Sequence, residues 1–170
     1  MLDTKEIEKD FLEAYDKHAD AIFRHCYFRV YDKELAEDLT QETFTKTWKY
    51  LSEGKDIENI KAFLYKVAIN LIIDNRRKRT TSPLDEFKEK KVSLRLNTVE
   101  DRMINRAEVS LIISKMNRLE DKYRDIILMR YVQDFSPAEI ANILGVSPNV
   151  VSVRLNYAVK KLKKTIRFES

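Results

Sequence analysis

The sequence is short of glycine, proline and cysteine, and each shortage excludes a class of protein. Only two glycines and three prolines occur among 170 residues, and they lie outside the segments of helical periodicity, which predicts a nearly all-helical chain. A single cysteine, Cys26, excludes an internal disulfide. Because no long uncharged apolar run and no basic-then-apolar leader occurs, we expect a cytoplasmic protein that is neither secreted nor membrane-spanning.

Motifs of enzymes and metal sites are also missing. The chain has no glycine-rich phosphate loop and no nucleophile within a recognisable motif. His18, His25 and Cys26 lack the paired-cysteine spacing of a metal site, so we expect them to pack in the core or on the surface. We therefore predict a protein that is not an enzyme and that holds neither a cofactor nor a metal.

Charge is distributed unevenly along the chain. Residues 1–60 contain 15 acidic and 9 basic residues, whereas residues 61–80 and residues 140–170 each contain 1 acidic and 6 basic residues. Solubility alone does not require such segregation. It predicts two contacts with nucleic acid and one acidic surface for a protein partner.

Residues 136–164 have the layout of a helix-turn-helix. Ser136 offers an N-cap oxygen, Pro137 suits the first helical position, and Glu139 can close a capping box. Gly145 follows where the first helix must stop in a left-handed conformation, and Ser147 starts the next helix. A connection this short favours two crossed helices, an arrangement typical of DNA-binding proteins.

The second of these helices has one apolar side and one basic side. At 100° per residue, apolar side chains from Val151 to Ile166 gather on one arc. No acidic residue occurs from Ile140 to Phe168, whereas the same stretch contains six basic residues. This pattern predicts contact with DNA phosphates. The outward face consists of Ser152, Val153, Asn156, Tyr157, Lys160, Lys163 and Lys164.

Three further helices are predicted in the N-terminal part, at about residues 7–30, 33–51 and 60–79. Asp32 is expected to cap the second helix, and Gly54 to follow its end. Apolar residues fill one broad side of the second helix. Its other side is polar and acidic, with Asp38, Gln41, Glu42 and Thr45.

The helix at 60–79 carries a polar stripe and ends in a basic cluster. Lys66, Asn70, Asp74 and Arg77 are spaced i, i+4, i+8 and i+11, which places amide and carboxylate groups between cations on one face. Such a face suits both bases and phosphates. The basic cluster is Arg76, Arg77, Lys78 and Arg79.

The periodicity breaks between residues 80 and 105, where Thr, Ser and Pro83 precede a stretch of mixed charge. We predict an all-α fold of two small helical domains, residues 1–79 and 106–170, joined by a flexible linker at 80–105. Helical periodicity returns from Ala107 to Val132. These helices are expected to support the helix-turn-helix.

The order of these segments resembles the bacterial RNA polymerase sigma factors, in their minimal two-domain extracytoplasmic-function (ECF) form. The stretch DLTQETFTKTW at 38–48 and the stretch IKAFLYKVAINLIIDNRRKR at 60–79 resemble sigma region two, and the helix-turn-helix resembles region four. The resemblance implies a protein that binds core RNA polymerase, directs it to particular promoters and helps to open them. Members of the family are commonly held silent by an anti-sigma factor. Such a partner is a further candidate, and it could keep the chain near the membrane.

The resemblance also assigns roles to residues. Docking on core polymerase would fall to Asp38, Gln41, Glu42 and Phe44. Recognition of the strand-separated −10 element would fall to Lys66, Asn70, Asp74, Arg76, Arg77 and Arg79. We place a base pocket between this helix and residues 52–59, because a captured base, stacking and phosphate contacts must offset the cost of opening a base pair. Reading of the duplex −35 element would fall to Asn149, Ser152, Val153, Arg154, Asn156, Tyr157, Lys160 and Lys161, with Arg154 holding a phosphate or a base edge.

Two other functions remain open from the residues alone. A conventional helix-turn-helix regulator would bind duplex operators without polymerase and would use its N-terminal helices for dimerisation or ligand binding. A helical adaptor would bind only proteins, and its basic ends would be solvated surface. Salt-sensitive DNA binding separates the adaptor from the other two.

Overall fold

The computed structural model describes residues 3–80 and 114–167, which are helical except for short turns and loops. The chain divides into two compact units, Met1–Val92 and Ser93–Ser170. The all-α prediction is confirmed for the described residues. The predicted linker at 80–105 lies outside them, apart from Thr80. Within the two described ranges, none of the helices combines the length and apolar content that a membrane crossing requires.

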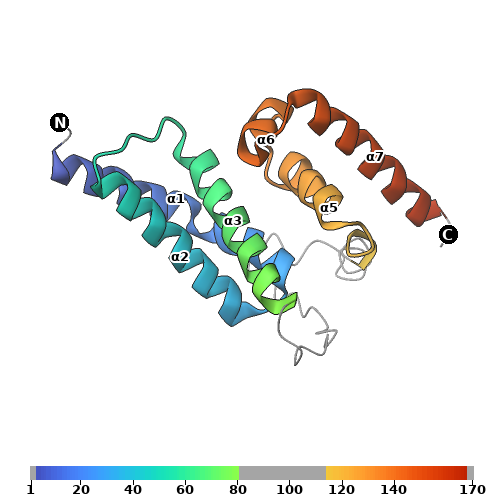
Figure 1. Cartoon of the computed structure of the whole chain (residues 1–170), viewed down its shortest axis with the longest axis horizontal. Coiled ribbons are helices and arrows are strands. Elements are labelled where there is room, and N and C mark those ends of the chain that lie inside the picture. The colour runs from blue at the N-terminus through green and yellow to red at the C-terminus, as the bar shows by residue number, and fades with distance from the viewer. Residues whose placement is uncertain (1–2, 81–113, 168–170) are drawn as a thin grey trace, which may run out of the picture. The chain divides into compact units, whose positions relative to one another are not determined.

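Three long helices make up the described part of the first unit: α1 (Thr4–Val30), α2 (Lys33–Ser52) and α3 (Ile60–Thr80). Each of them contacts the other two, and Figure 1 shows them as a bundle coloured from blue through cyan to green. These bounds agree closely with the predicted helices, because the helical periodicity of the apolar residues continues through each of them.

Short polar side chains set the beginnings of α1 and α2. The Lys5 amide donates to Asp3 Oδ1 at 3.4 Å, and the Leu35 amide donates to Asp32 Oδ1 at 3.2 Å. The predicted Asp32 cap is confirmed, whereas α1 begins at Thr4 rather than near residue 7 because Asp3 caps it. Tyr31 adopts a left-handed φ of 53°, which turns the chain between the two helices.

The core of the first unit consists of apolar side chains from all three helices, including the rings of Phe44 and Tyr65. Ile22, Leu64 and Ile72 are at most 1% exposed. The ring of His25, also buried, packs edge-on against Tyr65 at 5.0 Å between ring centroids. Cys26 is fully buried, and burial raises the pKa of its thiol to about 11. These residues therefore pack in the interior, one of the two placements that the sequence allowed.

The second unit contains α5 (Asp121–Ile127), a short π-helix η2 (Leu128–Val132), α6 (Pro137–Leu144) and α7 (Pro148–Arg167). Its described part begins with a helical turn at 114–116. The predicted periodicity from 107 to 132 is interrupted by a turn at 117–120 and ends in η2. One apolar cluster holds α7 against the preceding helices: Met116, Leu119, Ile127, Leu128 and Ala158, with Tyr123, Leu155 and Leu162 packed on it.

The predicted helix-turn-helix is confirmed in α6 and α7. Ser136 Oγ accepts from the Glu139 amide at 3.2 Å, and Glu139 Oε2 accepts from the Ser136 amide at 2.8 Å, which completes a capping box. Gly145 ends α6 with a left-handed φ of 68°. The Val150 amide donates to Ser147 Oγ at 3.3 Å at the start of α7. The polar side chains predicted to start α6 and α7 thus make the expected hydrogen bonds to backbone amides.

Replacing Ser136 by alanine is expected to lower the free energy of unfolding by about 1 kcal/mol, because an amide at the start of α6 then loses its acceptor. Chemical denaturation followed by circular dichroism measures this change. Ser136→Thr retains the hydroxyl and should stay within about 0.5 kcal/mol of the unaltered chain. Equal loss in both variants would contradict the capping role.

Candidate nucleic-acid and protein interfaces

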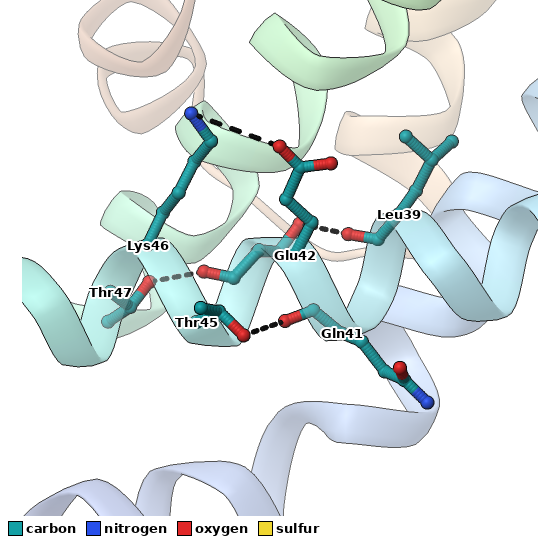
Figure 2. A network of polar contacts seen from close by, with 7 residues as sticks. Leu39, Gln41, Glu42, Thr45, Lys46 and Thr47 are labelled. Atoms are coloured by element: carbon teal, nitrogen blue, oxygen red, sulfur yellow. Dashed lines mark hydrogen bonds and ion pairs between the residues drawn. The ribbon is translucent and has the colours of Figure 1, made fainter.

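The acidic face predicted on α2 is exposed to solvent. Asp38, Gln41 and Glu42 are all exposed, and Figure 2 shows the Gln41 and Glu42 side chains extending away from the helix. Glu42 forms an ion pair with Lys46 at 4.0 Å, in which both side chains are 54% exposed. Because an exposed pair of this kind is weak, the Glu42 carboxylate can exchange Lys46 for another cation at little cost.

Threonines of α2 donate hydrogen bonds to carbonyl oxygens one turn earlier in the helix. Thr43 Oγ1 donates to the Leu39 carbonyl at 2.7 Å, and Thr47 Oγ1 donates to the Thr43 carbonyl at 2.8 Å. Both threonines are fully buried. On the exposed side, Thr45 Oγ1 donates to the Gln41 carbonyl at 2.9 Å (Figure 2). The buried hydroxyls are thereby satisfied within α2, on the side of the helix away from solvent.

Phe44 does not share the exposed face with the three polar residues. Its side chain is 4% exposed. The ring packs against Phe11 and Tyr15 of α1, with centroids 6.2 and 4.8 Å apart. In this structure Phe44 fixes α2 against α1, and the polar residues of the face lie on other sides of the helix.

The polar stripe on α3 is also exposed. Lys66, Asn70, Asp74 and Arg77 are all exposed, as is Arg79, whereas Arg76 is half-buried. The opposite side of α3 places Leu64, Ala68 and Ile72 in the core. The predicted stripe therefore lies on the solvent-facing side of α3, and the other side of this helix is buried.

The loop between α2 and α3 contacts the end of α2. Lys55 Nζ donates to Glu53 Oε2 at 2.7 Å and lies 5.0 Å from the centre of the Tyr50 ring. This hydrogen bond lowers the pKa of Glu53 and raises the pKa of Lys55. Tyr50 in turn packs against Phe63 of α3 at 4.8 Å between centroids. The base pocket placed between α3 and residues 52–59 stays a prediction.

The outward face of α7 agrees with its helical periodicity. Val151 and Ala158 are fully buried on the inner arc. Half-buried positions on the flanks include Arg154 and Lys161. The residues exposed on the outer face are Asn149, Ser152, Val153, Asn156, Tyr157 and Lys160.

Sequence patterns did not single out the aromatic contact beside this face. Tyr123 of α5 packs against Tyr157 of α7, with ring centroids 4.6 Å apart. Lys122 Nζ lies 5.0 Å from the centre of the Tyr123 ring, and Lys161 Nζ lies 5.7 Å from that of Tyr157. The two tyrosines are far apart in sequence, so no local period relates them. Only the packing of α5 on α7 reveals that Tyr123 supports a residue of the outer face.

Both units match families of known proteins. The sequence model for sigma-70 region 2 matches residues 14–81, and that for sigma-70 region 4 matches residues 110–162. The helices that a conventional regulator would use for dimerisation or ligand binding therefore correspond to sigma region 2. These two regions are the ones whose resemblance predicts an ECF-type sigma factor.

Relatives that align with this chain over most of their length are named as sigma factors. The ECF RNA polymerase sigma factor SigL of Mycobacterium tuberculosis is 31% identical over 160 residues, which cover 90% of this chain and 86% of SigL. SigW of Bacillus subtilis is 27% identical over 166 residues, covering 92% of this chain and 89% of SigW.

Solved structures with a similar fold include CnrH, in complex with the cytosolic domain of CnrY (TM-score 0.71, 20% identity, 96% of this chain and 91% of that chain). They also include the sigma factor RpoE from Bartonella quintana, in complex with the anti-sigma factor NepR (TM-score 0.75, 20% identity, 95% and 99%). Both sigma regions occur in the expected order, and SigL is more than 30% identical over most of both chains. This chain therefore belongs to the ECF sigma factors of bacterial RNA polymerase, which bind core polymerase and direct it to promoters.

Proposed function

We propose that this chain divides its work as a sigma factor among three surfaces. The exposed face of α2 binds core RNA polymerase, the stripe on α3 binds the strand-separated −10 element, and the outer face of α7 binds the duplex −35 element. In this proposal residues 1–79 perform the first two tasks and residues 106–170 the third. The observation that carries it is the segregation of charge, because the acidic face lies on α2 whereas the C-terminal parts of α3 and α7 are basic.

The polymerase contact is supported by exposure and charge. Asp38, Gln41 and Glu42 are exposed on α2, whose other side is buried. An exposed face with carboxylates selects a basic partner surface, because complementary charges speed association and exclude partners of like charge. Phe44 supports this contact indirectly, because it packs α2 on α1.

The −10 contact is supported by the mixture of groups on α3. Asn70 and Asp74 offer hydrogen-bonding groups that can reach base edges, and Lys66, Arg77 and Arg79 offer cations for the backbone. A single-stranded segment needs both kinds of contact, because the base pairing that was lost must be replaced. The chain itself supplies only these binding groups, and we propose that polymerase performs all of the chemistry.

The −35 contact is supported by the helix-turn-helix and by the absence of acidic residues from 140 to 168. A major groove admits one α-helix, and its phosphates attract flanking cations. We propose that α7 enters the groove. Arg154 lies on the flank of its outer face and is half-buried, so it contacts a phosphate rather than a base edge.

Replacing Arg154 by alanine is therefore expected to weaken binding to all upstream sequences by a similar factor. The slope of log affinity against log salt concentration should fall by about 1. Filter-binding titrations of the holoenzyme at several salt concentrations measure both quantities. A loss confined to one base position, of about 1–3 kcal/mol, would show instead that Arg154 reads a base.

Initiation on native promoters tests the whole proposal. Core polymerase is mixed with the full chain and with a library of genomic promoter fragments, and the transcripts are sequenced. The proposed function predicts initiation at a set of fragments that share two spaced motifs and that core polymerase alone does not use. Initiation that does not depend on the chain would contradict it.

The fold likeness to CnrH and RpoE supports a further proposal about partners. Both of those proteins were solved in complexes, RpoE with an anti-sigma factor and CnrH with a cytosolic domain of CnrY. We propose that an anti-sigma factor also binds this chain and covers surfaces that polymerase needs. Because polymerase and promoter DNA are its other partners, we propose that the chain acts in the cytoplasm.

A further inference from the structure

The centre of the outer face of α7 is apolar. Val153 is 60% exposed, and Tyr157, one turn later, is 48% exposed. Single exposed apolar residues are common on protein surfaces, but these two lie on the same side of one helix. The core does not require them, because Val151 and Ala158 fill the inner arc. Their exposure is best explained by a partner that has apolar groups of its own.

The neighbours of this apolar pair are suited to DNA. At 100° per residue, Asn149 and Asn156 lie within about 60° of Val153, and all three side chains are exposed. An asparagine can bond adenine through its N6 and N7 atoms, and thymine, which pairs with adenine, presents an apolar C5-methyl group in the major groove. Asparagine beside valine is therefore a combination that fits an A·T pair.

The same part of α7 lacks the groups that favour a G·C pair. Guanine is most often recognised by arginine or lysine. Between residues 148 and 157 the sequence contains one such residue, Arg154, and it is half-buried on the flank of the outer face. Lys160 and Lys161 follow further along the helix.

The Tyr157 ring is held in place before any ligand binds. It packs against the tilted Tyr123 ring at 4.6 Å between centroids, and Lys161 Nζ lies 5.7 Å from its centre. A side chain that is already fixed loses less conformational freedom on binding. The valine and the tyrosine together form a preorganised apolar wall on the outer face.

We infer that the duplex element bound by α7 contains an A·T pair whose thymine methyl group packs between Val153 and Tyr157. This inference rests on the proposed contact between α7 and duplex promoter DNA, and it adds which base pair is read and by which group. Asn149 or Asn156 bonds the adenine of the same pair or of its neighbour.

Exchange of thymine for uracil tests the inference, because it removes the methyl group and leaves base pairing unchanged. Holoenzyme made from core polymerase and the full chain first selects sequences from a pool of duplexes whose upstream element is randomised. Each thymine of the selected element is then replaced in turn by uracil. At one position the affinity should fall about fourfold, the effect of burying one methyl group.

Two variants assign the methyl contact to its residues. In Val153→Ala the thymine and uracil duplexes should bind with affinities that agree within about twofold, because part of the apolar wall is gone. Ile166→Ala provides the matched control, since it removes a 44% exposed apolar side chain from the same helix. This control should keep the full fourfold difference.

The outcomes separate the inference from the function on which it rests. If the unaltered holoenzyme binds every uracil duplex as tightly as its thymine counterpart, the inference is overturned and the proposed function stands. A methyl effect that persists undiminished in Val153→Ala also overturns it, because another residue then makes the contact. Failure to select any sequence from the pool contradicts the proposed function instead.

Discussion

Replacing Glu42 by lysine is expected to abolish binding of the chain to core RNA polymerase while its helices stay intact. Glu42 is exposed beside Asp38 and Gln41 on α2. The substitution changes the charge of this face by two units and places a cation where a basic partner must approach. Like charges brought together at an interface cost several kcal/mol, which corresponds to a loss in affinity of more than about a hundredfold.

The same substitution costs little in stability. It removes the exposed ion pair between Glu42 and Lys46 and replaces it with a repulsive pair one turn apart, an effect of about 0.5 kcal/mol. Size-exclusion chromatography of the chain with core polymerase measures assembly, and circular dichroism checks that the helices remain.

Glu13→Lys is a matched control for this experiment. Glu13 also forms an i,i+4 ion pair, with Lys9 at 4.0 Å, and its side chain is 68% exposed on α1. The control changes the net charge by the same amount on a different helix, and it should leave holoenzyme assembly within about threefold of the unaltered chain. If both variants lose assembly equally, net charge rather than the α2 face governs the contact.

The combined change Arg77→Glu and Arg79→Glu is expected to prevent stable promoter opening without preventing holoenzyme assembly. Both arginines are exposed near the C-terminal end of α3. A hydrogen bond to a charged group contributes about 1.5–3 kcal/mol, so loss of two phosphate contacts should reduce the population of open complexes by at least about a hundredfold. Permanganate reactivity of thymines in the melted region measures this population.

A pre-opened template shows which step the two arginines serve. If they hold the separated strand, as we propose, binding of the variant holoenzyme to a duplex with an unpaired bubble should remain weak. If the bubble restores full binding, the arginines act only while the strands separate. Lys5→Glu with Lys9→Glu is the matched control, since both lysines are exposed on α1, and it should open promoters normally.

Much of the fold could be predicted because local signals and packing agree. The capping box at Ser136 and the left-handed Gly145 both depend on a few neighbouring residues, and the structure contains both. The π-helix η2, in which Leu128 and Met129 are buried, could not be predicted, because no local residue signal distinguishes its wider turn from an α-helical one. The left-handed Tyr31 is similar, since a tyrosine there gives no local turn signal.

The surfaces were predictable to the extent that helical periodicity determines exposure. The stripe on α3 and the outer face of α7 are exposed as their spacing indicates. Phe44 lies on the apolar side of α2 that periodicity predicts, and α1 covers it, so its polymerase role rests on the resemblance and not on exposure. Tyr123 shows the limit of this reasoning, because its role depends on a contact between α5 and α7 that no sequence period encodes.

The burial of Cys26 affects whether its thiol can sense oxidants. With a pKa of about 11, only about one thiol in ten thousand carries the reactive negative charge at neutral pH, and the side chain is 0% exposed. Peroxides and disulfide reagents therefore react slowly with the Cys26 thiol of the folded chain, and the sequence has no other cysteine. A thiol-based response to oxidants would therefore have to begin on another molecule and reach this chain through binding.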